Sequence, residues 1–296
     1  MVDHKIHSAV VWLALACALC CSALQAQESQ AEPKAADDGM KAWYAFYQRE
    51  AESVYRFKLG SNDQDLTLDR TPVLRWTNPL EEGSIHGVVY IWREQGRPVV
   101  VGQLFSYLNG KSGRVYCHAM HSLARSDEKL AAFRNGKSFW TPDSPGVELR
   151  DVPQAPAPAA TRPLRLAQMK EISRRFAAET DEAARGKRVL RLLPTPLDRY
   201  PENAANGTDG ALFSFVVGND PEVMLLVEAV PSQTGSIWKY GLCRSTRSSC
   251  RALLDDVEVW HYESANGNPS DPGSGYLSVH GIETLPLTPP KLPVAE

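Results

Sequence analysis

Residues 209–230 read DGALFSFVVGNDPEVMLLVEAV, and residues 87–108 read GVVYIWREQGRPVVVGQLFSYL. Each stretch has two apolar runs separated by a short polar turn, which is typical of a β-hairpin. An offset of 123 residues aligns the two stretches without a gap. It pairs Gly87 with Gly210, Gly96 with Asn219, Pro98 with Pro221 and Val100 with Val223. Because Gly and Asn most readily adopt the positive φ of a tight turn, the repeat extends to turn chemistry and predicts an internal duplication.

The flanking segments repeat in the same order. A helical stripe beginning at Met40 precedes the first hairpin, and a second stripe of Leu166, Met169, Ile172 and Phe176, ended by Gly186, precedes the second. Leu130 to Arg134 is interpreted as a short helix. We therefore expect an α+β fold of two related halves, each one helix on a four- to five-stranded antiparallel sheet. Chance similarity of two meandering sheets is the competing interpretation.

Both hairpins are apolar on both faces of their strands, which predicts that the halves bury surface against each other as a pseudo-dimer. A Pro/Ala-rich stretch separates the halves and is expected to run as an extended linker. The expected boundaries are 37–150 for the first half, 151–163 for the linker, 164–265 for the second half and 266–296 for a loop and Pro-rich tail.

The first 26 residues have the pattern of a secretory signal peptide. Lys5 precedes the run AVVWLALACALCCSAL at residues 9–24, which is too short to span a bilayer. We expect cleavage after Ala26, a disordered lead at 27–36, no membrane span after cleavage, and a periplasmic or extracellular location.

Three of the six cysteines lie within this predicted signal. Of the remaining three, Cys243 and Cys250 flank a Ser/Thr/Arg-rich turn and could form a disulfide in an oxidising compartment. The alternative is a pair of thiols too far apart to bridge. Cys117 is expected to be a small buried hydrophobic residue.

The composition excludes several classes of protein. A net charge of -3, 43% hydrophobic and 23% charged residues indicate a folded protein and give no electrostatic reason to expect nucleic-acid binding. No phosphate-binding loop, dinucleotide motif or HExxH motif occurs, so we expect neither a cofactor nor a metal.

The stretches RVLRLLPTPLDRY and DGALFSFVVGNDPEVMLLVEAV resemble a family of uncharacterised exported bacterial proteins. The resemblance runs from about Trp76 to Trp260. It implies export and a single shared fold, and it implies no activity, ligand or catalytic residue.

One cluster could carry chemistry: Cys117, His118 and His121, with His86 upstream. On a strand, Cys117 and His121 would face one side and His118 the other, so the motif lacks the three or four converging ligands of a zinc site. A thiol nucleophile would need a histidine within hydrogen-bond reach.

These observations favour an exported, non-enzymatic binding or interaction protein of the cell envelope. Its partner would be another envelope protein or a small ligand at the junction of the halves. The alternative is a hydrolase-type enzyme centred on His86, Cys117, His118 and His121. A third hypothesis is an interaction module that docks through its Pro-rich segments.

Overall fold

The computed structural model describes residues 39–60, 64–78, 84–125, 128–182, 185–201, 209–233, 235–264 and 268–289. The chain divides into two compact units, one of residues 1–46 with 288–296 and one of Tyr47–Leu287. The predicted signal, the Ala26 cleavage site and the 27–36 lead lie outside the described residues. Among the residues described, no helix has both the length and the apolar character needed to cross a bilayer.

In the smaller unit, residues 39–46 form the first turns of a helix that continues to residue 53. The rings of Trp43 and Phe46 meet edge to face, with centroids 5.9 Å apart.

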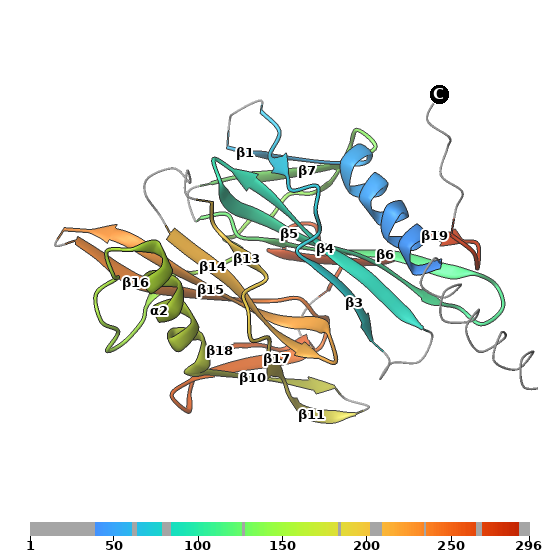
Figure 1. Cartoon of the computed structure of the whole chain (residues 1–296). Helices are drawn as coiled ribbons and strands as arrows, with labels where there is room; N and C mark the ends of the chain where they lie inside the picture. The colour runs from blue at the N-terminus through green and yellow to red at the C-terminus, as the bar shows by residue number, and fades with distance from the viewer. Residues whose placement is uncertain are drawn as a thin grey trace, which may run out of the picture. The chain divides into compact units, whose positions relative to one another are not determined.

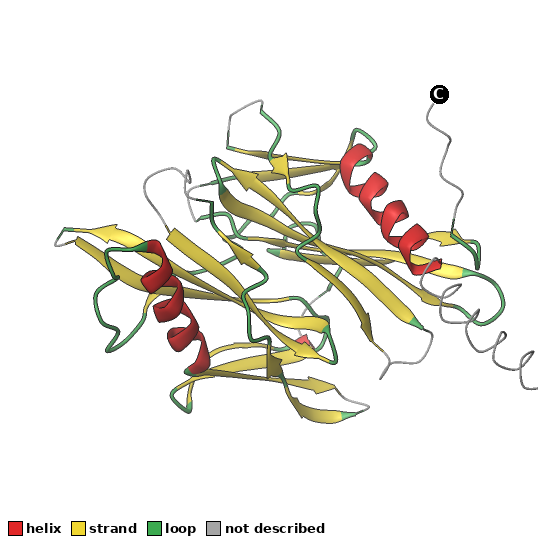
Figure 2. Cartoon of the chain, in the orientation of Figure 1, coloured by secondary structure: helices red, strands yellow, loops and turns green. Residues whose placement is uncertain are grey.

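Two six-stranded antiparallel sheets form the centre of this unit (Figures 1 and 2). In the first central sheet the order is β19-β6-β5-β4-β2, with β3 also paired to β4. Its strands are β2 (Thr67–Leu68), β3 (Leu74–Asn78), β4 (Ile85–Glu94), β5 (Arg97–Leu108), β6 (Arg114–Ser122) and β19 (Tyr276–Leu285). In the second central sheet the order is β12-β14-β15-β16-β9, with β13 paired to β14. Its strands are β9 (Arg150–Asp151), β12 (Arg191–Leu192), β13 (Asp198–Arg199), β14 (Asp209–Val217), β15 (Asp220–Ser232) and β16 (Gly235–Arg244).

A smaller sheet packs on the outer face of each central sheet. The first outer sheet contains β1 (Tyr55–Leu59), β7 (Leu130–Arg134) and β8 (Lys137–Trp140). The second contains β10 (Phe176–Glu182), β11 (Gly186–Val189), β17 (Ser249–Leu254) and β18 (Val257–Tyr262). Helix α2 (Arg162–Arg174) begins after Thr161 with Pro163 in its first turn, where a missing N–H costs nothing. The fold is therefore α+β, dominated by strands.

The strand pairings of the two halves follow the same order. Strands β1 to β8 correspond in turn to β10, β12, β13, β14, β15, β16, β17 and β18, with the same antiparallel partners. The register also agrees beside two bulges. Trp92 pairs with Val100 as Phe215 pairs with Val223, and Ala132 pairs with Trp140 as Ala252 pairs with Trp260. The halves thus repeat one arrangement of hairpins.

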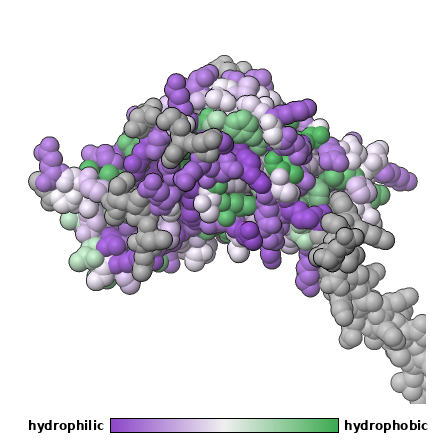
Figure 3. Space-filling view, turned by 90° about the horizontal axis from the view of Figure 1, so that it is seen from above, coloured by the Kyte–Doolittle hydropathy of each residue, from purple (hydrophilic) through white to green (hydrophobic). Residues whose placement is uncertain are grey.

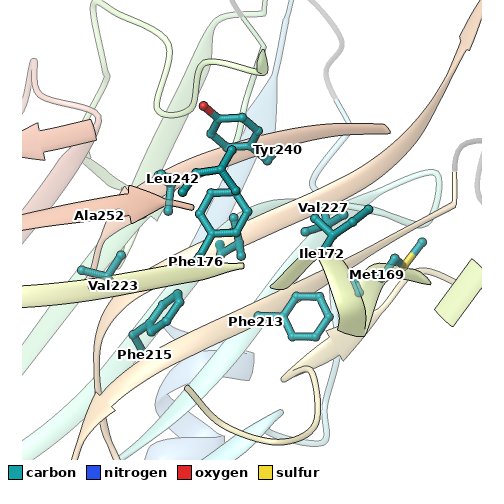
Figure 4. Close-up of a cluster of buried hydrophobic side chains, with 14 of the residues drawn as sticks. Met169, Ile172, Phe176, Phe213, Phe215, Val223, Val227, Tyr240, Leu242 and Ala252 are labelled. Carbon is teal, nitrogen blue, oxygen red and sulfur yellow. The ribbon is translucent and has the colours of Figure 1, made fainter. Parts of the chain in front are cut away.

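Hydrophobic cores hold the layers together, and two of them lie on the two faces of the second central sheet. In the first, α2 and the second outer sheet cover the outer face of the second central sheet, with Met169, Ile172 and Phe176 against Phe213 and Phe215 (Figure 4). The second core lies between the two central sheets. It contains residues of both halves, among them Trp76, Val89, Phe105, Leu212, Met224 and Leu226. The prediction that the halves bury apolar surface against each other is therefore confirmed.

Several local expectations were wrong. Each half contains two sheets instead of one, because its first strand pairs with its last hairpin in an outer sheet: β1 with β7 of β7–β8, and β10 with β17 of β17–β18. Leu130–Arg134 is strand β7, not a helix. Helix α2 ends at Arg174, so Phe176 begins strand β10 and Gly186 does not end the helix. Strand β19 falls within the segment expected to be a loop and tail, and it pairs with β6 of the first half.

Candidate functional site

The predicted polar centre is divided between the two faces of the first central sheet. His86, Ser106 and Tyr116 are cross-strand partners, so they share the outer face of the sheet, which His118 also faces. Cys117 and His121 alternate with His118 along β6 and therefore point to the inner face. They are four residues apart along the strand, about 13 Å.

Both outer-face histidines are buried against tyrosines. The Tyr47 hydroxyl lies 3.1 Å from His86 Nδ1 and 2.7 Å from the Ser106 hydroxyl, while the Tyr55 hydroxyl lies 2.9 Å from His118 Nδ1. Burial lowers the pKa of both histidines to about 3, and the Arg114 and Arg134 guanidiniums add to the shift at His86 and His118 respectively. At neutral pH both imidazoles are uncharged.

Burial also shifts the pKa values of the two inner-face residues, His121 and Cys117. His121 Nε2–H donates to the Gly146 carbonyl at 2.8 Å, and burial lowers its pKa to about 4. Burial raises the pKa of Cys117 to about 11, so the sulfur is a thiol and not a nucleophilic thiolate. Within the described parts of the chain, no three His, Cys, Asp or Glu side chains are grouped to hold a metal ion. The four residues do not form one site.

Cys117, Cys243 and Cys250 are all buried free thiols in this structure. Cys243 lies in the core between the central sheets, whereas Cys250 lies in the core under the second outer sheet. The Cys243–Cys250 disulfide is therefore absent here, and its formation in an oxidising compartment stays a prediction.

A cleft of about 220 Å³ opens where the two central sheets separate. Its floor is the inner face of the first central sheet, where Trp76, Gly87, Phe105, Cys117 and His280 form one cross-strand row. Its opposite wall comes from the second half, from the start of β15 and the turn after β16. Those wall residues are Asp220, Pro221, Glu222, Ser245, Thr246, Arg247 and Ser248.

Gly87 shapes the floor because it has no side chain. A Cβ at this position would lie 2.6 Å from Phe105 Cβ and 2.8 Å from Trp76 Cζ2. The missing side chain lets the two aromatic rings approach to a centroid distance of 5.9 Å. His280 meets the Phe105 ring edge to face at 5.5 Å, which extends the aromatic surface toward the mouth of the cleft.

Hydrogen bonds between the halves fix the sides of the cleft. Gln103 Nε2 donates to the Ser245 hydroxyl at 2.6 Å and to the Ser245 carbonyl at 3.2 Å. Asn78 Nδ2 donates to Asp220 Oδ2 at 3.3 Å. Both contacts join a residue of the first half to one of the second, so the cleft is part of the interface between the halves.

A more polar groove crosses the second outer sheet, but it has the features of an ordinary solvated surface. Arg251 pairs with Glu179 at 2.7 Å and with Glu258 at 3.5 Å, and both pairs are partly exposed. Such pairs contribute little to stability, and within each pair the opposite charges already compensate each other. The face shown in Figure 3 is likewise mostly hydrophilic, with small separate hydrophobic groups.

The sequence predicts a ligand site at the junction of the two halves, but it does not indicate the residues that line the cleft. The register of the first central sheet brings Trp76 and Phe105 together through Gly87, and the packing of the two central sheets adds Asp220. The 123-residue offset was the signal that could have pointed to these residues. It aligns Asp220 with Arg97 and Glu228 with Phe105, so residues of different charge occupy corresponding positions in the two halves.

Comparison of the chain with protein-family models, with curated proteins and with solved structures gave no match. The resemblance to uncharacterised exported bacterial proteins therefore stays a prediction.

Proposed function

We propose that this chain is a non-enzymatic binding protein that holds a small ligand in the cleft between its two central sheets. The observation that carries the proposal is the composition of the cleft. It combines an aromatic floor with amides, hydroxyls and charged groups, and both halves contribute to it. A concave site with apolar walls and a few oriented polar groups is typical of small-molecule binding.

The hydrolase alternative has little physical support. It required His86, Cys117, His118 and His121 to act together, but these groups are divided between two faces of a sheet. Burial also makes the histidines weak bases, with pKa values of about 3 to 4, and keeps Cys117 a thiol. A nucleophile and its base must lie within hydrogen-bond reach. No observation favours a different catalytic centre.

We further propose that the two halves arose by internal duplication and that the protein is exported. The matching strand order and register support the first proposal. The apolar run at residues 9–24 supports the second. An envelope location would place the cleft where small solutes or other envelope components can reach it.

A fragment screen by ligand-observed NMR tests the proposed function. Thr246 lines the cleft, and Thr246→Trp should fill it, whereas Thr67→Trp places the same side chain at an exposed position of β2. We expect fragments that bind the wild type and Thr67→Trp but not Thr246→Trp. A screen without such fragments, in variants that melt like the wild type, would contradict the proposal.

A further inference from the structure

A second pocket, of about 180 Å³, lies at the seam between the second central sheet and the second outer sheet. Its apolar walls are Tyr240 and Leu242 of β16 with Val259 and Trp260 of β18. Tyr240 and Leu242 belong to the core under the outer sheet (Figure 4), while Val259 and Trp260 are partly exposed. The remaining wall is a flanking segment, residues 145–150, that runs beside β16. An apolar cavity of about 150 Å³ is large enough for benzene, so this pocket can hold a compact molecule.

The first half has a corresponding seam, between β6 of its central sheet and β8 of its outer sheet. Gly102 pairs with Met120 as Leu225 pairs with Leu242, so Met120 has the place of Leu242. The two seams can therefore be compared residue by residue.

Two groups close the seam of the first half. Leu277 of β19 pairs with Met120, so both side chains lie on the face that meets the outer sheet, and Leu277 is only 2% exposed. The indole N–H of Trp140, which corresponds to Trp260, donates to the Ser274 carbonyl at 2.7 Å, and Trp140 is 1% exposed. An aliphatic side chain and a carbonyl oxygen thus fill this seam.

The seam of the second half lacks both groups. The flanking segment runs beside β16 as β19 runs beside β6, with Arg150 opposite Tyr240. Glu148, two residues earlier, therefore has the place of Leu277, but its side chain is 75% exposed. The indole N–H of Trp260 donates to no residue that the structure describes. The pocket is the space that these two differences leave.

The two charged residues in the lining of the pocket are already paired. Arg150 donates to Glu148 Oε2 at 2.8 Å and to the Val259 carbonyl at 2.6 Å. Their opposite charges compensate each other at the solvent-exposed rim, so a charged ligand gains little there. An uncharged ligand suits the apolar walls and the single indole donor.

We propose that this pocket binds a small uncharged amide with a branched aliphatic group about the size of a leucine side chain. The aliphatic group takes the place that Leu277 fills in the first half, and the amide oxygen accepts the Trp260 N–H as the Ser274 carbonyl accepts that of Trp140. Burial of the aliphatic group drives binding, and the hydrogen bond orients the ligand. This site is separate from the cleft between the central sheets and goes beyond the function proposed above.

An NMR titration of the full chain, carrying isotope-labelled tryptophan, with N-acetyl-L-leucinamide tests the proposal. The resonance that is missing from Trp260→Phe identifies the Trp260 indole. We expect this resonance to move downfield and to saturate, because its proton gains an acceptor. N-acetylglycinamide has the amide without the aliphatic group and should bind at least about tenfold more weakly.

Three variants locate the site. Glu148→Leu supplies the side chain that Leu277 provides in the first half, so it should fill the pocket and weaken binding at least about tenfold. Glu171→Leu makes the same change at an exposed position of α2 and should bind as the wild type does. Thr246→Trp, which fills the cleft instead, should also bind normally.

The outcomes distinguish this inference from the proposed function. A Trp260 resonance that does not move, or equal affinity for N-acetylglycinamide, would show that the assignment is wrong. Unchanged binding by a Glu148→Leu protein that melts like the wild type would also contradict it. Loss of binding in Thr246→Trp would place the ligand in the cleft, so this inference would fail while the proposed function stands.

Discussion

Three buried imidazoles, those of His86, His118 and His121, couple the stability of the fold to pH. Burial lowers the pKa of each from the ordinary value of 6.5 to about 3 or 4. The unfolded chain binds protons below pH 6.5 while the folded chain does not. Their contribution to stability is therefore complete above pH 6.5 and is lost as the pH falls toward the folded-state pKa values.

We predict a loss of about 2 kcal/mol of unfolding free energy per buried imidazole between pH 7 and pH 5. Urea unfolding at the two pH values measures it. His118→Asn should reduce this loss, because it removes one of the buried imidazoles. An unaltered loss in His118→Asn would show that His118 is protonated or exposed in the folded state.

The three buried thiols give a second prediction at the residue scale. Burial raises the pKa values of Cys117 and Cys250 to about 11 and about 12, so the folded protein should react very slowly with a thiol reagent at pH 8. In a protein beginning at Gln27, unfolding without reductant should release three reactive thiols. A count of one would instead show that Cys243 and Cys250 form the disulfide that the sequence suggested.

At the scale of the elements, ion pairs join the strands of the two halves, and the pair of Arg93 with Asp198 is bidentate. Arg93 of β4 holds Asp198 of β13 through two hydrogen bonds, of 3.0 and 2.5 Å, and both side chains are about nine-tenths buried. Asp69 also pairs with Arg93, at 2.7 Å, so removing the Asp198 charge leaves the guanidinium with one partly exposed partner. We predict that Asp198→Asn lowers the unfolding free energy by about 1–3 kcal/mol, because two hydrogen bonds between charged groups are weakened in the interior.

Asp255 provides the matched control. Both of its carboxylate oxygens accept hydrogen bonds from Arg175, but its side chain is about half exposed. Chemical denaturation of Asp198→Asn and Asp255→Asn compares the two positions. The exposed pair should contribute little, because solvent screens it. An equal loss in both variants would show that burial does not determine the value of these pairs.

Elements were predictable from sequence where the hydrophobic pattern was long and was repeated. The hairpins around Gly96 and Asn219 satisfied both conditions. Leu130–Arg134 did not, because its Leu-Ala-Ala-Phe run is short and its residues favour helices when considered alone. The segment with the same place in the second half, Ser249–Leu254, is strand β17. Strand β19 was missed because it has no counterpart in the first half.

At the scale of the whole molecule, we expect the two halves to unfold together, because they share a core. Leu226 of β15 lies in the core between the central sheets, and its neighbour Leu225 lies in the core under the second outer sheet. Both side chains are fully buried. The sequence predicted this shared interior from the apolar faces of the strands. It could not locate the cleft, which depends on where two twisted sheets separate.

We predict that Leu226→Ala and Leu225→Ala each lower the unfolding free energy by about 2–5 kcal/mol. Differential scanning calorimetry should show one transition in the wild type and in both variants, shifted to lower temperature. Two separated transitions, with each variant moving only one of them, would mean that the halves unfold independently.

Strand β19 has a consequence for how the protein is made. It pairs with β6, which ends at Ser122, yet it is completed only at Leu285. Until residue 285 has been synthesised, β6 lacks this neighbour and presents unpaired backbone groups along one side. A nascent chain with such an open edge is prone to wrong pairings. Delaying the folding of the first central sheet until Leu285 has been synthesised would avoid that danger.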